Sequence, residues 1–555
     1  MFSHITFVTA FIDIYKDFAI DNKTIERQCN TFREIASIGI PIIIFVCKNT
    51  QPYIEILKPE YENLLILEVL NIEDTWVYKN SESIDFSLPF YRNTKKDTVE
   101  YMYLIHAKAE FLYKAVEVNP WKSIHFAWID FNISYLFKEP ERTFEYIRIF
   151  AQRTVTDTCL VIPGCWREKI SLLNTEYYIN NVVWRFCGGF LLGDANSIKK
   201  LFELYREHFA DFLKTHKTFV WDVNFWAWLE AKGHWTPRWY EADHNDSIIQ
   251  IPADICCKNL YRDVAITKYD YPMIENFGPG SASYIYFKGE HLVNTRYINY
   301  SILKNGCYDI RDPNGIIISK NMFSILNDNL EPIHFIELNE DNIGLPSNKC
   351  YFNGLEDIRL YAVGDTLKFI ATNINYSPTG YNRMIVGEYD IENHSYKNCI
   401  VTKPPYDTVC EKNWIPLIKN EKEYFIYKWS PLEIGRLNTK NELEIEIRHD
   451  IISPWFHKVR GSTLFIDNGE HLVGLVHFSE ETTPRRYYHM LVSLDKDTLK
   501  PLKYSEIFCF QHLGIEFCIG FTIKNDEYVF WISQMDREPL MISMSIDKMK
   551  LIYEF

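Results

Sequence analysis

The pattern of the sequence changes near residue 265, and this change constrains the fold more than any other feature. Before it, apolar β-branched runs such as 41–47 (PIIIFVC) and 64–70 (LLILEVL) alternate with helix-like segments such as 24–37. After it, long helical patterns disappear and hairpin patterns replace them. We therefore expect an α/β domain over residues 1–262 and an all-β domain over residues 263–555.

The continuous apolar runs of the first domain are typical of strands that are buried on both faces. Together with the alternating helices they predict a three-layer, Rossmann-type sheet. A long helix is predicted over 97–117, with Asp97 as its N-cap and Glu100 three residues further on. Lys108 falls on the apolar stripe of this helix, which is an unusual place for a cation.

Five segments of the second domain resemble one another. Each consists of an apolar strand, a polar turn and a second apolar strand. They are 283–297, 358–373, 414–429, 461–478 and 518–533. Hairpins repeated at intervals of roughly 50 residues are typical of propeller blades. We predict a five-bladed β-propeller, with a β-sandwich as the alternative.

Composition excludes some functions. The net charge of −15 argues against non-specific binding to nucleic acid, which needs clustered Lys and Arg. The 13 Cys include no CxxC pair, which indicates a reduced compartment, the cytoplasm. No apolar run approaches the roughly 20 residues of a transmembrane segment. The Ile-, Asn-, Lys- and Tyr-rich composition is typical of AT-rich genomes such as those of large DNA viruses, for which the compartment would be the host cytoplasm.

A candidate metal clamp directly follows the apolar run that ends at Ile129. Asp130 and Asn132 lie two residues apart and face the same side, as in an Asp-x-Asp clamp. His244, which follows the aromatic pair Trp239-Tyr240, could complete the metal site as an imidazole ligand. Carboxylate and imidazole ligands suit a divalent cation that neutralises a leaving diphosphate. The alternatives are a turn at Asp130 and a structural histidine at 244.

Two further motifs suit a ligand-binding edge. Gly188-Gly189 would let the backbone approach a ligand closely, or they mark a β-bulge. Asp222 precedes a helix-like run and could act as a general base towards an acceptor hydroxyl. As a helix N-cap it would need no such role.

The motifs FVTAFID (7–13), NTKKDT (93–98), WID (128–130), GGF (188–190) and the pair Trp239-Tyr240 followed by His244 resemble the HtrL/YibB-like family over about the first 260 residues. That resemblance implies a glycosyltransferase of the GT-A type, with a UDP- or GDP-sugar donor, a glycan acceptor and Mn²⁺ or Mg²⁺. It places Thr9, Ala10 and Asp13 in the nucleotide pocket, and Lys96, Asp97, Thr98 and Lys108 beside the donor. Asn132 stands where that family usually has the second Asp of the clamp.

Polar residues near the first strand of several predicted blades would converge on one central pocket. The motifs GLEDIR (354–359), EKNWIP (411–416) and GIEFCIG (514–520) resemble the five-bladed propellers of glycoside hydrolases and mannoside phosphorylases, with Ile358 where that family commonly has Pro. By that resemblance Glu356 and Asp357 are candidate catalytic carboxylates. The other candidate glycan-binding residues are Arg296, Arg359, Lys412, Asn413, Trp414, Arg460, His477, Tyr487, His489 and Glu516.

Three functional hypotheses follow. The first is a metal-dependent glycosyltransferase whose propeller binds the glycan or carries a second glycosidic activity. The second is a glycoside phosphorylase or hydrolase in the propeller, with the first domain auxiliary. The third is a non-catalytic glycan-binding scaffold. The alternative for the charged groups in the propeller is that they only pair with one another.

Overall fold

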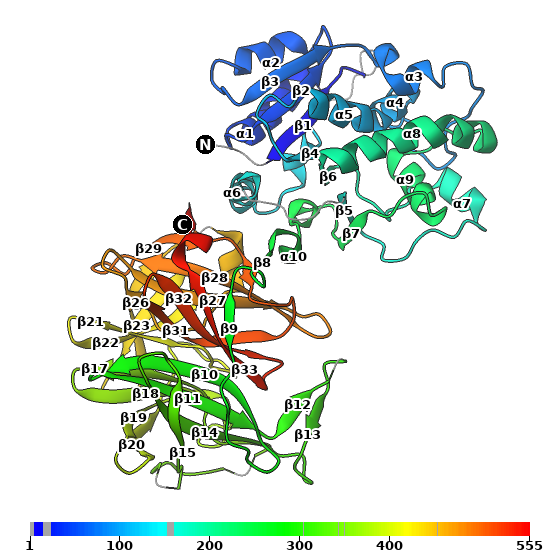
Figure 1. Ribbon diagram of the computed structural model, residues 1–555. Coiled ribbons are helices and arrows are strands. Elements are labelled where there is room, and N and C mark those ends of the chain that lie inside the picture. Colours follow the sequence, from blue (N-terminus) through cyan, green and yellow to red (C-terminus); the bar gives the residue numbers. More distant parts are fainter. Residues whose placement is uncertain are drawn as a thin grey trace. The chain divides into compact units, whose positions relative to one another are not determined.

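The computed structural model describes residues 5–14, 24–152, 160–303, 305–341, 343–348, 350–451 and 453–555. The chain divides into two compact units (Figure 1). Unit 1 is Met1–Cys256 and unit 2 is Cys257–Phe555. Within the described ranges, no helix is both long enough and apolar enough to cross a membrane.

Unit 1 is built on a seven-stranded sheet with the strand order β3-β2-β1-β4-β6-β5-β7. Its strands are β1 (Ile5–Phe11), β2 (Ile42–Val46), β3 (Leu64–Val69), β4 (His125–Ile129), β5 (Val161–Gly164), β6 (Phe190–Asp194) and β7 (Arg238–Glu241). The neighbours β3, β2, β1 and β4 run parallel, as do β5 and β7, whereas β6 is antiparallel to β4 and β5. The predicted α/β class is confirmed.

The helices of unit 1 are α1 (Ile25–Ala36), α2 (Gln51–Leu57), α3 (Trp76–Lys79), α4 (Val99–His106), α5 (Lys108–Val118), α6 (Pro140–Ala151), α7 (Thr175–Asn180), α8 (Ala195–His216), α9 (Asp222–Ala231) and α10 (Ala253–Cys256). Helices α5 and α8 lie side by side and pack on the strands β1, β4 and β6 (Figure 1).

The single helix predicted over 97–117 is wrong in two respects. The chain forms two helices, α4 and α5, which meet at Ala107, where ψ is −11°. The N-cap is Thr98, whose hydroxyl accepts the N–H of Tyr101. Asp97 cannot cap the helix because its carboxylate accepts the backbone N–H of Asn93 instead (3.0 Å).

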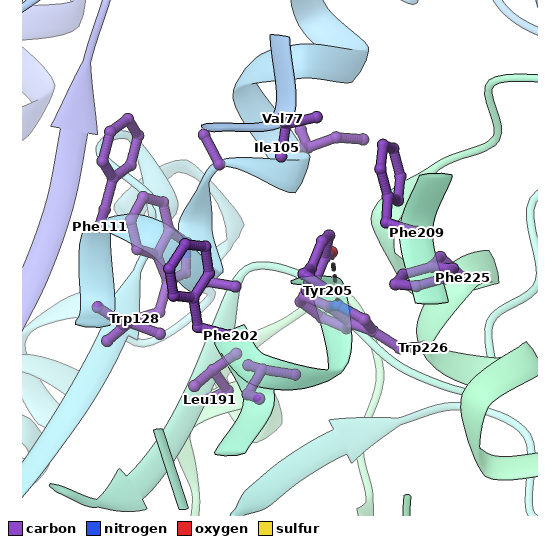
Figure 2. Packing of buried hydrophobic residues seen from close by; sticks show 14 of the residues in the cluster. Val77, Ile105, Phe111, Trp128, Leu191, Phe202, Tyr205, Phe209, Phe225 and Trp226 are labelled. Carbon is purple, nitrogen blue, oxygen red and sulfur yellow. Dashed lines mark hydrogen bonds between the residues drawn. The ribbon is translucent and has the colours of Figure 1, made fainter. Parts of the chain in front are cut away.

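Large aromatic side chains fill the core between the sheet and these helices (Figure 2). Phe111 of α5 lies over Trp128 of β4, with ring centroids 6.4 Å apart. Tyr205 of α8 accepts a hydrogen bond from the indole N–H of Trp226 (2.9 Å). The buried imidazole of His106 contacts the same Tyr205 hydroxyl (3.1 Å), so the polar edges of these rings are satisfied inside the core.

Unit 2 is all-β. Its first sheet contains β10 (Gly278–Phe287), β11 (Glu290–Ile298), β14 (Ile317–Leu326), β15 (Pro332–Glu337) and β16 (Phe352–Asn353). The second contains β17 (Glu356–Val363), β18 (Thr366–Asn373), β19 (Arg383–Asp390) and β20 (Ser395–Val401). The third contains β21 (Ile415–Lys419), β22 (Lys422–Trp429), β23 (Leu432–Leu437) and β24 (Leu443–His449).

The remaining sheets have eight, four and two strands. The eight-stranded sheet contains β8 (Lys258–Asn259), β25 (Arg460–Gly461), β26 (Ile466–Asp467), β27 (Leu472–Glu480), β28 (Arg486–Leu494), β29 (Pro501–Ser505), β30 (Phe508–Cys509) and β34 (Leu551–Glu554). The four-stranded sheet contains β9 (Ala265–Thr267), β31 (Glu516–Lys524), β32 (Glu527–Gln534) and β33 (Glu538–Ser545). The two-stranded sheet contains β12 (Tyr300–Ile302) and β13 (Tyr308–Ile310).

Each of the five predicted hairpins forms an antiparallel pair of strands, with turns near Gly289, Asp365, Glu421, Gly469 and Asp526. The first strands of neighbouring sheets touch, since β10 contacts both β17 and β31, and β17 contacts β21. The arrangement is propeller-like. The number of blades stays a prediction, because the strands are divided unequally among the sheets.

Strands from both ends of unit 2 complete its later sheets. The early strand β9 pairs with β33, with Ile266 opposite Ile542. The last strand, β34, pairs with β29. Each of these strands pairs with a strand that would otherwise be an exposed sheet edge.

Candidate functional sites

The first candidate site is a cavity of about 580 Å³ in unit 1, at the carboxyl ends of the parallel neighbours β1 and β4. Ligands collect at this edge of open α/β sheets because loops leave a crevice beyond the strand ends. The predicted residues that line the cavity are Ala10, Asp13, Lys96, Lys108, Asp130 and Asn132. The fold thus brings together side chains from four separate parts of the sequence.

The ammonium group of Lys108 is held by two carboxylates. Its Nζ lies 3.0 Å from Oδ2 of Asp222 and 3.5 Å from Oδ1 of Asp130, and it donates to the carbonyl of Gly188 (2.8 Å). Burial lowers the pKa of Lys108, but the two carboxylates outweigh burial and raise that pKa above its ordinary value. Lys108 therefore carries a stable positive charge at the edge of the cavity.

Asp222 is the first residue of α9, where Trp221 and not Asp222 occupies the N-cap position. Its carboxylate is buried, accepts the N–H of Val223 (2.9 Å) and faces Lys108. A Cβ added to Gly188 would lie 3.1 Å from both Asp222 Oδ2 and Lys108 Nζ. A glycine at this position therefore leaves room for the ion pair.

Among the three charged side chains of Lys108, Asp222 and Asp130, that of Asp130 is the most exposed. Its Oδ1 accepts the indole N–H of Trp128 (2.7 Å), and its side chain is 47% exposed. Asn132 donates from Nδ2 to Oε1 of Gln28 (2.8 Å), while its buried Oδ1 has no hydrogen-bond partner among the described residues. Both residues line the cavity, and their role as metal ligands stays a prediction.

His244 lies with different residues from those predicted for the metal clamp. It contacts Cys165 and Asp243, and its ring meets that of Trp184 edge-on at 4.3 Å. The described contacts therefore do not assemble Asp130, Asn132 and His244 around one point. The predicted Mn²⁺ or Mg²⁺ stays a prediction, and we derive no chemical step through it.

The other residues predicted for the donor site are not among those that line this cavity. Thr9 is buried in β1, and its hydroxyl has no hydrogen-bond partner within the described ranges. Asp97 and Thr98 shape the start of α4, as described above. Gly189 lies beside Asp130, because a Cβ on it would be 3.5 Å from Asp130 Oδ2.

The second candidate site is a cluster of charges in unit 2 around Arg296 of β11. The guanidinium lies 3.1 Å from Asp357 Oδ1 and 3.4 Å from Glu356 Oε2, and its Nε donates to Ser319 (2.9 Å). Both carboxylates are at the start of β17, on the neighbouring sheet. The two predicted catalytic carboxylates are therefore adjacent to a predicted glycan-binding arginine.

A third carboxylate, Asp536, belongs to the same cluster and was missed by the sequence analysis. It accepts a hydrogen bond from the hydroxyl of Tyr300 (3.0 Å) and interacts electrostatically with Arg296, Asp357 and Glu356. Burial raises its pKa, and the neighbouring carboxylates add to that effect while Arg296 opposes it. The sequence feature that could have identified Asp536 is its place in the polar turn just after the aromatic strand β32.

The backbone holds two of these carboxylates in an unusual conformation. Asp357 has φ +51° and Asp536 has φ +60°, both in the left-handed region that non-glycine residues rarely adopt. Around Asp357 the pairing of β17 with β18 shifts register between Glu356 and Arg359, as in a β-bulge. Bulges and left-handed residues commonly re-aim side chains near functional sites.

Tyrosines and further cations surround the three carboxylates. Tyr308 interacts with Asp536, Arg485 and Lys412, and Tyr487 interacts with Asp536, Arg485 and Asp357. Burial raises the pKa of Tyr487 to about 12, and Asp536 adds to the rise. Lys412 and Arg485 are exposed, so the cluster combines acids, aromatic rings and accessible cations.

Several residues predicted to face a glycan are part of the core instead. Their side chains are almost fully buried, and all of them except His489 have polar atoms that bond to the protein. Arg359 donates to the carbonyl of Ser462, Trp414 donates to Glu411, His477 bonds to the Ser462 hydroxyl, and Glu516 accepts three backbone N–H groups. Asn413 accepts from Arg359, and burial lowers the pKa of His489 to about 3. Arg460 is exposed.

Comparisons with known proteins give matches of two kinds. A family model described as a bacterial protein of unknown function (HtrL_YibB) matches residues 3–218, which is less than half of the chain. No curated protein matches the chain.

Solved structures of carbohydrate-active enzymes are similar over about half of the chain. A β-1,2-mannobiose phosphorylase from Listeria innocua has 16% identity and a TM-score of 0.36, over 52% of this chain and 98% of that one. A mannose phosphorylase from Leishmania mexicana has 10% identity and a TM-score of 0.33, over 51% and 87%. A glycosyl hydrolase from Bacteroides ovatus has 12% identity and a TM-score of 0.33, over 50% and 86%.

Proposed function

We propose that unit 2 cleaves a glycosidic bond of an oligosaccharide, by hydrolysis or by phosphorolysis. The observation that carries this proposal is the convergence of Glu356, Asp357 and Asp536 on the guanidinium of Arg296. Two carboxyl groups in different protonation states are what acid-assisted cleavage of a glycoside needs. The aromatic rings of Tyr308 and Tyr487 provide surfaces suited to sugar rings.

The environments of the carboxylates suggest distinct roles. Burial raises the pKa of Asp536, so this carboxyl group is suited to hold a proton and donate it to the leaving glycosidic oxygen. Asp357 is paired with Arg296 and is suited to act as a carboxylate that orients the attacking group. For phosphorolysis, the exposed Lys412 and Arg485 would attract the phosphate anion.

The test is release of sugar from a panel of mannosides and other oligosaccharides, with and without inorganic phosphate. Asp357→Asn and Asp536→Asn should each lower the rate by about 100-fold or more, the usual contribution of a general acid or base. Asp365→Asn is the matched control, because Asp365 is an exposed aspartate in the turn at the other end of β17. Full activity in both site variants would exclude this proposal.

A second candidate function rests on the cavity of unit 1. We propose that it binds a nucleotide-sugar and transfers the sugar to a glycan. Support comes from Asp13, Lys96 and Asp130, which line a cavity at the strand ends of an open α/β sheet. A cation at the cavity is suited to stabilise a leaving diphosphate, and Lys96 lines this cavity.

The transferase proposal is tested by calorimetric titration of the full chain with UDP, GDP and their sugars, with and without Mn²⁺. Asp130→Ala should abolish binding of the donor or weaken it at least about 10-fold, because Asp130 is the exposed carboxylate of the cavity. Asp211→Ala is the control, since Asp211 is a highly exposed aspartate on α8. Absence of binding across the panel would exclude this function.

A further inference from the structure

Two cysteines, an aspartate and a histidine that neither proposed function uses meet at one edge of the sheet in unit 1. Cys165 directly follows β5, and Asp243 and His244 follow the parallel neighbour β7. Cys187 lies in the loop before β6. Residues from three strand ends therefore contribute to one small cluster.

The potential ligand atoms are close together. The two Sγ atoms are 3.7 Å apart, and Cys165 Sγ lies 3.9 Å from His244 Nδ1 and 3.9 Å from Asp243 Oδ1. The ligand atoms of Cys165, Cys187 and His244 all lie within 4.8 Å of one another. In a tetrahedral zinc site with Zn–S of about 2.3 Å and Zn–N of about 2.0 Å, sulfurs are about 3.8 Å apart and sulfur and nitrogen about 3.6 Å apart.

We propose that Cys165, Cys187, His244 and Asp243 bind one Zn²⁺ ion. Two thiolates with an imidazole select zinc over Mg²⁺ or Ca²⁺, which prefer oxygen ligands. The side chains of His244 and Asp243 are 39% and 75% exposed, which provides an entry path, whereas Cys187 is buried. The cysteines are free thiols, and their sulfur separation is far longer than the roughly 2.05 Å of a disulfide.

The backbone around the cysteines is held in place without the metal. Cys187 N–H donates to the carbonyl of Pro163 (2.8 Å), and Cys165 N–H donates to that of Trp184 (2.9 Å). Arg185 forms a two-pronged ion pair with the buried Glu230, with bonds of 2.8 and 2.7 Å. A metal would therefore bind to a site whose geometry already exists, at a small cost in conformational entropy.

The zinc site is separate from both proposed functions but adjoins the first cavity. Cys187 immediately precedes Gly188 and Gly189, which lie against Lys108, Asp222 and Asp130. A bound ion would tie the loop before β6 to the ends of β5 and β7. The ion would thereby support the position of the glycine pair without being a ligand for the substrate.

The test is titration of the reduced, chelator-treated full chain with Co²⁺ as a spectroscopic probe and then with Zn²⁺. We expect one equivalent of Co²⁺ to give the visible bands of a tetrahedral site and a thiolate-to-cobalt charge-transfer band, both removed by Zn²⁺. Cys165→Ala and Cys187→Ala should abolish the charge-transfer band or weaken it strongly. His244→Ala should lower the affinity at least about 10-fold.

Cys29→Ala is the matched control, because Cys29 is a buried cysteine of α1 in the same unit and should leave the spectrum unchanged. His244→Ala keeps the test valid if a buried cysteine variant fails to fold, since His244 is exposed. The proposal is overturned if the wild-type chain gives no tetrahedral spectrum, or if His244→Ala binds cobalt as tightly as wild type. It is also overturned if mass mapping finds a Cys165–Cys187 disulfide and the reduced protein binds no metal.

Discussion

The Lys108 ammonium and the Asp222 carboxylate show how much a single residue depends on its partner. Both side chains are about 95% buried, and their charged atoms lie 3.0 Å apart. Removing one partner of a buried ion pair leaves an uncompensated charge, which costs far more than the pair contributes.

We expect Lys108→Met to destabilise unit 1 by about 3–5 kcal/mol in urea unfolding at neutral pH. Burial already raises the pKa of Asp222, and loss of Lys108 would raise it further. A carboxyl group with a raised folded-state pKa contributes stability at low pH and loses it as pH rises through that pKa. The loss of unfolding free energy caused by Lys108→Met should therefore be larger at about pH 8 than at about pH 5.

Adding Asp222→Asn to the Lys108→Met variant should recover much of the stability and remove its pH dependence. The double variant serves as the control, because it lacks both charges. Equal losses at both pH values, or no recovery in the double variant, would contradict the buried ion pair.

Asp536 in unit 2 allows a second test at the residue scale. Burial raises its pKa, so wild-type stability should fall as pH rises through that pKa, whereas an asparagine does not titrate. We expect Asp536→Asn to unfold at higher urea concentration than wild type at about pH 8, with a smaller difference at about pH 4. If Asp536→Asn gains stability but loses the cleavage of glycosidic bonds, that combination would be typical of a functional carboxylate. A pH-independent difference would contradict the raised pKa.

At the scale of elements, Arg359 joins three parts of unit 2. From β17 its guanidinium donates to the carbonyl of Ser462 near β25 (2.6 Å) and to Asn413 just before β21 (3.0 Å). The residue is fully buried and has no carboxylate within ion-pairing distance in the described structure, and burial lowers its pKa to about 10. Arg359 therefore connects sheets instead of binding a ligand.

We expect Arg359→Lys to lower the unfolding free energy of unit 2 by about 3 kcal/mol. The two acceptors are bonded by two different guanidinium nitrogens, and the single ammonium nitrogen of lysine cannot occupy both positions, so one buried acceptor is left unsatisfied. Arg448→Lys on β24 is the control, since Arg448 is 61% exposed and a lysine there keeps the positive charge. The measurement is thermal unfolding followed by near-ultraviolet circular dichroism. If Arg359→Lys lowers the unfolding free energy as little as Arg448→Lys does, the hydrogen bonds of Arg359 to the neighbouring sheets do not stabilise unit 2.

At the scale of the whole molecule, each unit has its own hydrophobic core. The core of unit 1 lies between its sheet and helices such as α5 and α8, whereas the cores of unit 2 lie between its sheets. Separate cores predict two unfolding transitions in differential scanning calorimetry.

The double substitution Ile266→Pro/Thr267→Pro should lower the midpoint of only the transition that belongs to unit 2. Adjacent residues of a strand point their N–H groups in opposite directions, so one of the two prolines must remove a hydrogen bond between β9 and β33. Ile266→Ala retains the backbone bonds and is the control. A single transition, or a shift in both, would contradict independent unfolding of the two units.

Much of the fold could be predicted from local patterns. The apolar runs 41–47 and 64–70 contain β2 and β3, and the five polar turns lie within the predicted hairpins, because period and turn chemistry are local properties. Burial of β3 on both faces was predicted wrongly, because β3 is an edge strand in which only Leu64 is buried. The break at Ala107 was not predicted. It accompanies contacts of His106 with the Val220 carbonyl and of Lys108 with Asp222, residues more than 100 positions further along the chain.

Sequence alone determined the two classes of unit, the strand end at Asp130 and the pair Glu356-Asp357, because each depends on residues close together in the chain. Tertiary structure alone decided which side chains share a site. It placed Lys108 between Asp130 and Asp222, brought Asp536 to Arg296, and set His244 beside Cys165 instead of Asp130. Such pairings depend on strand order and loop paths, which residue spacing does not encode.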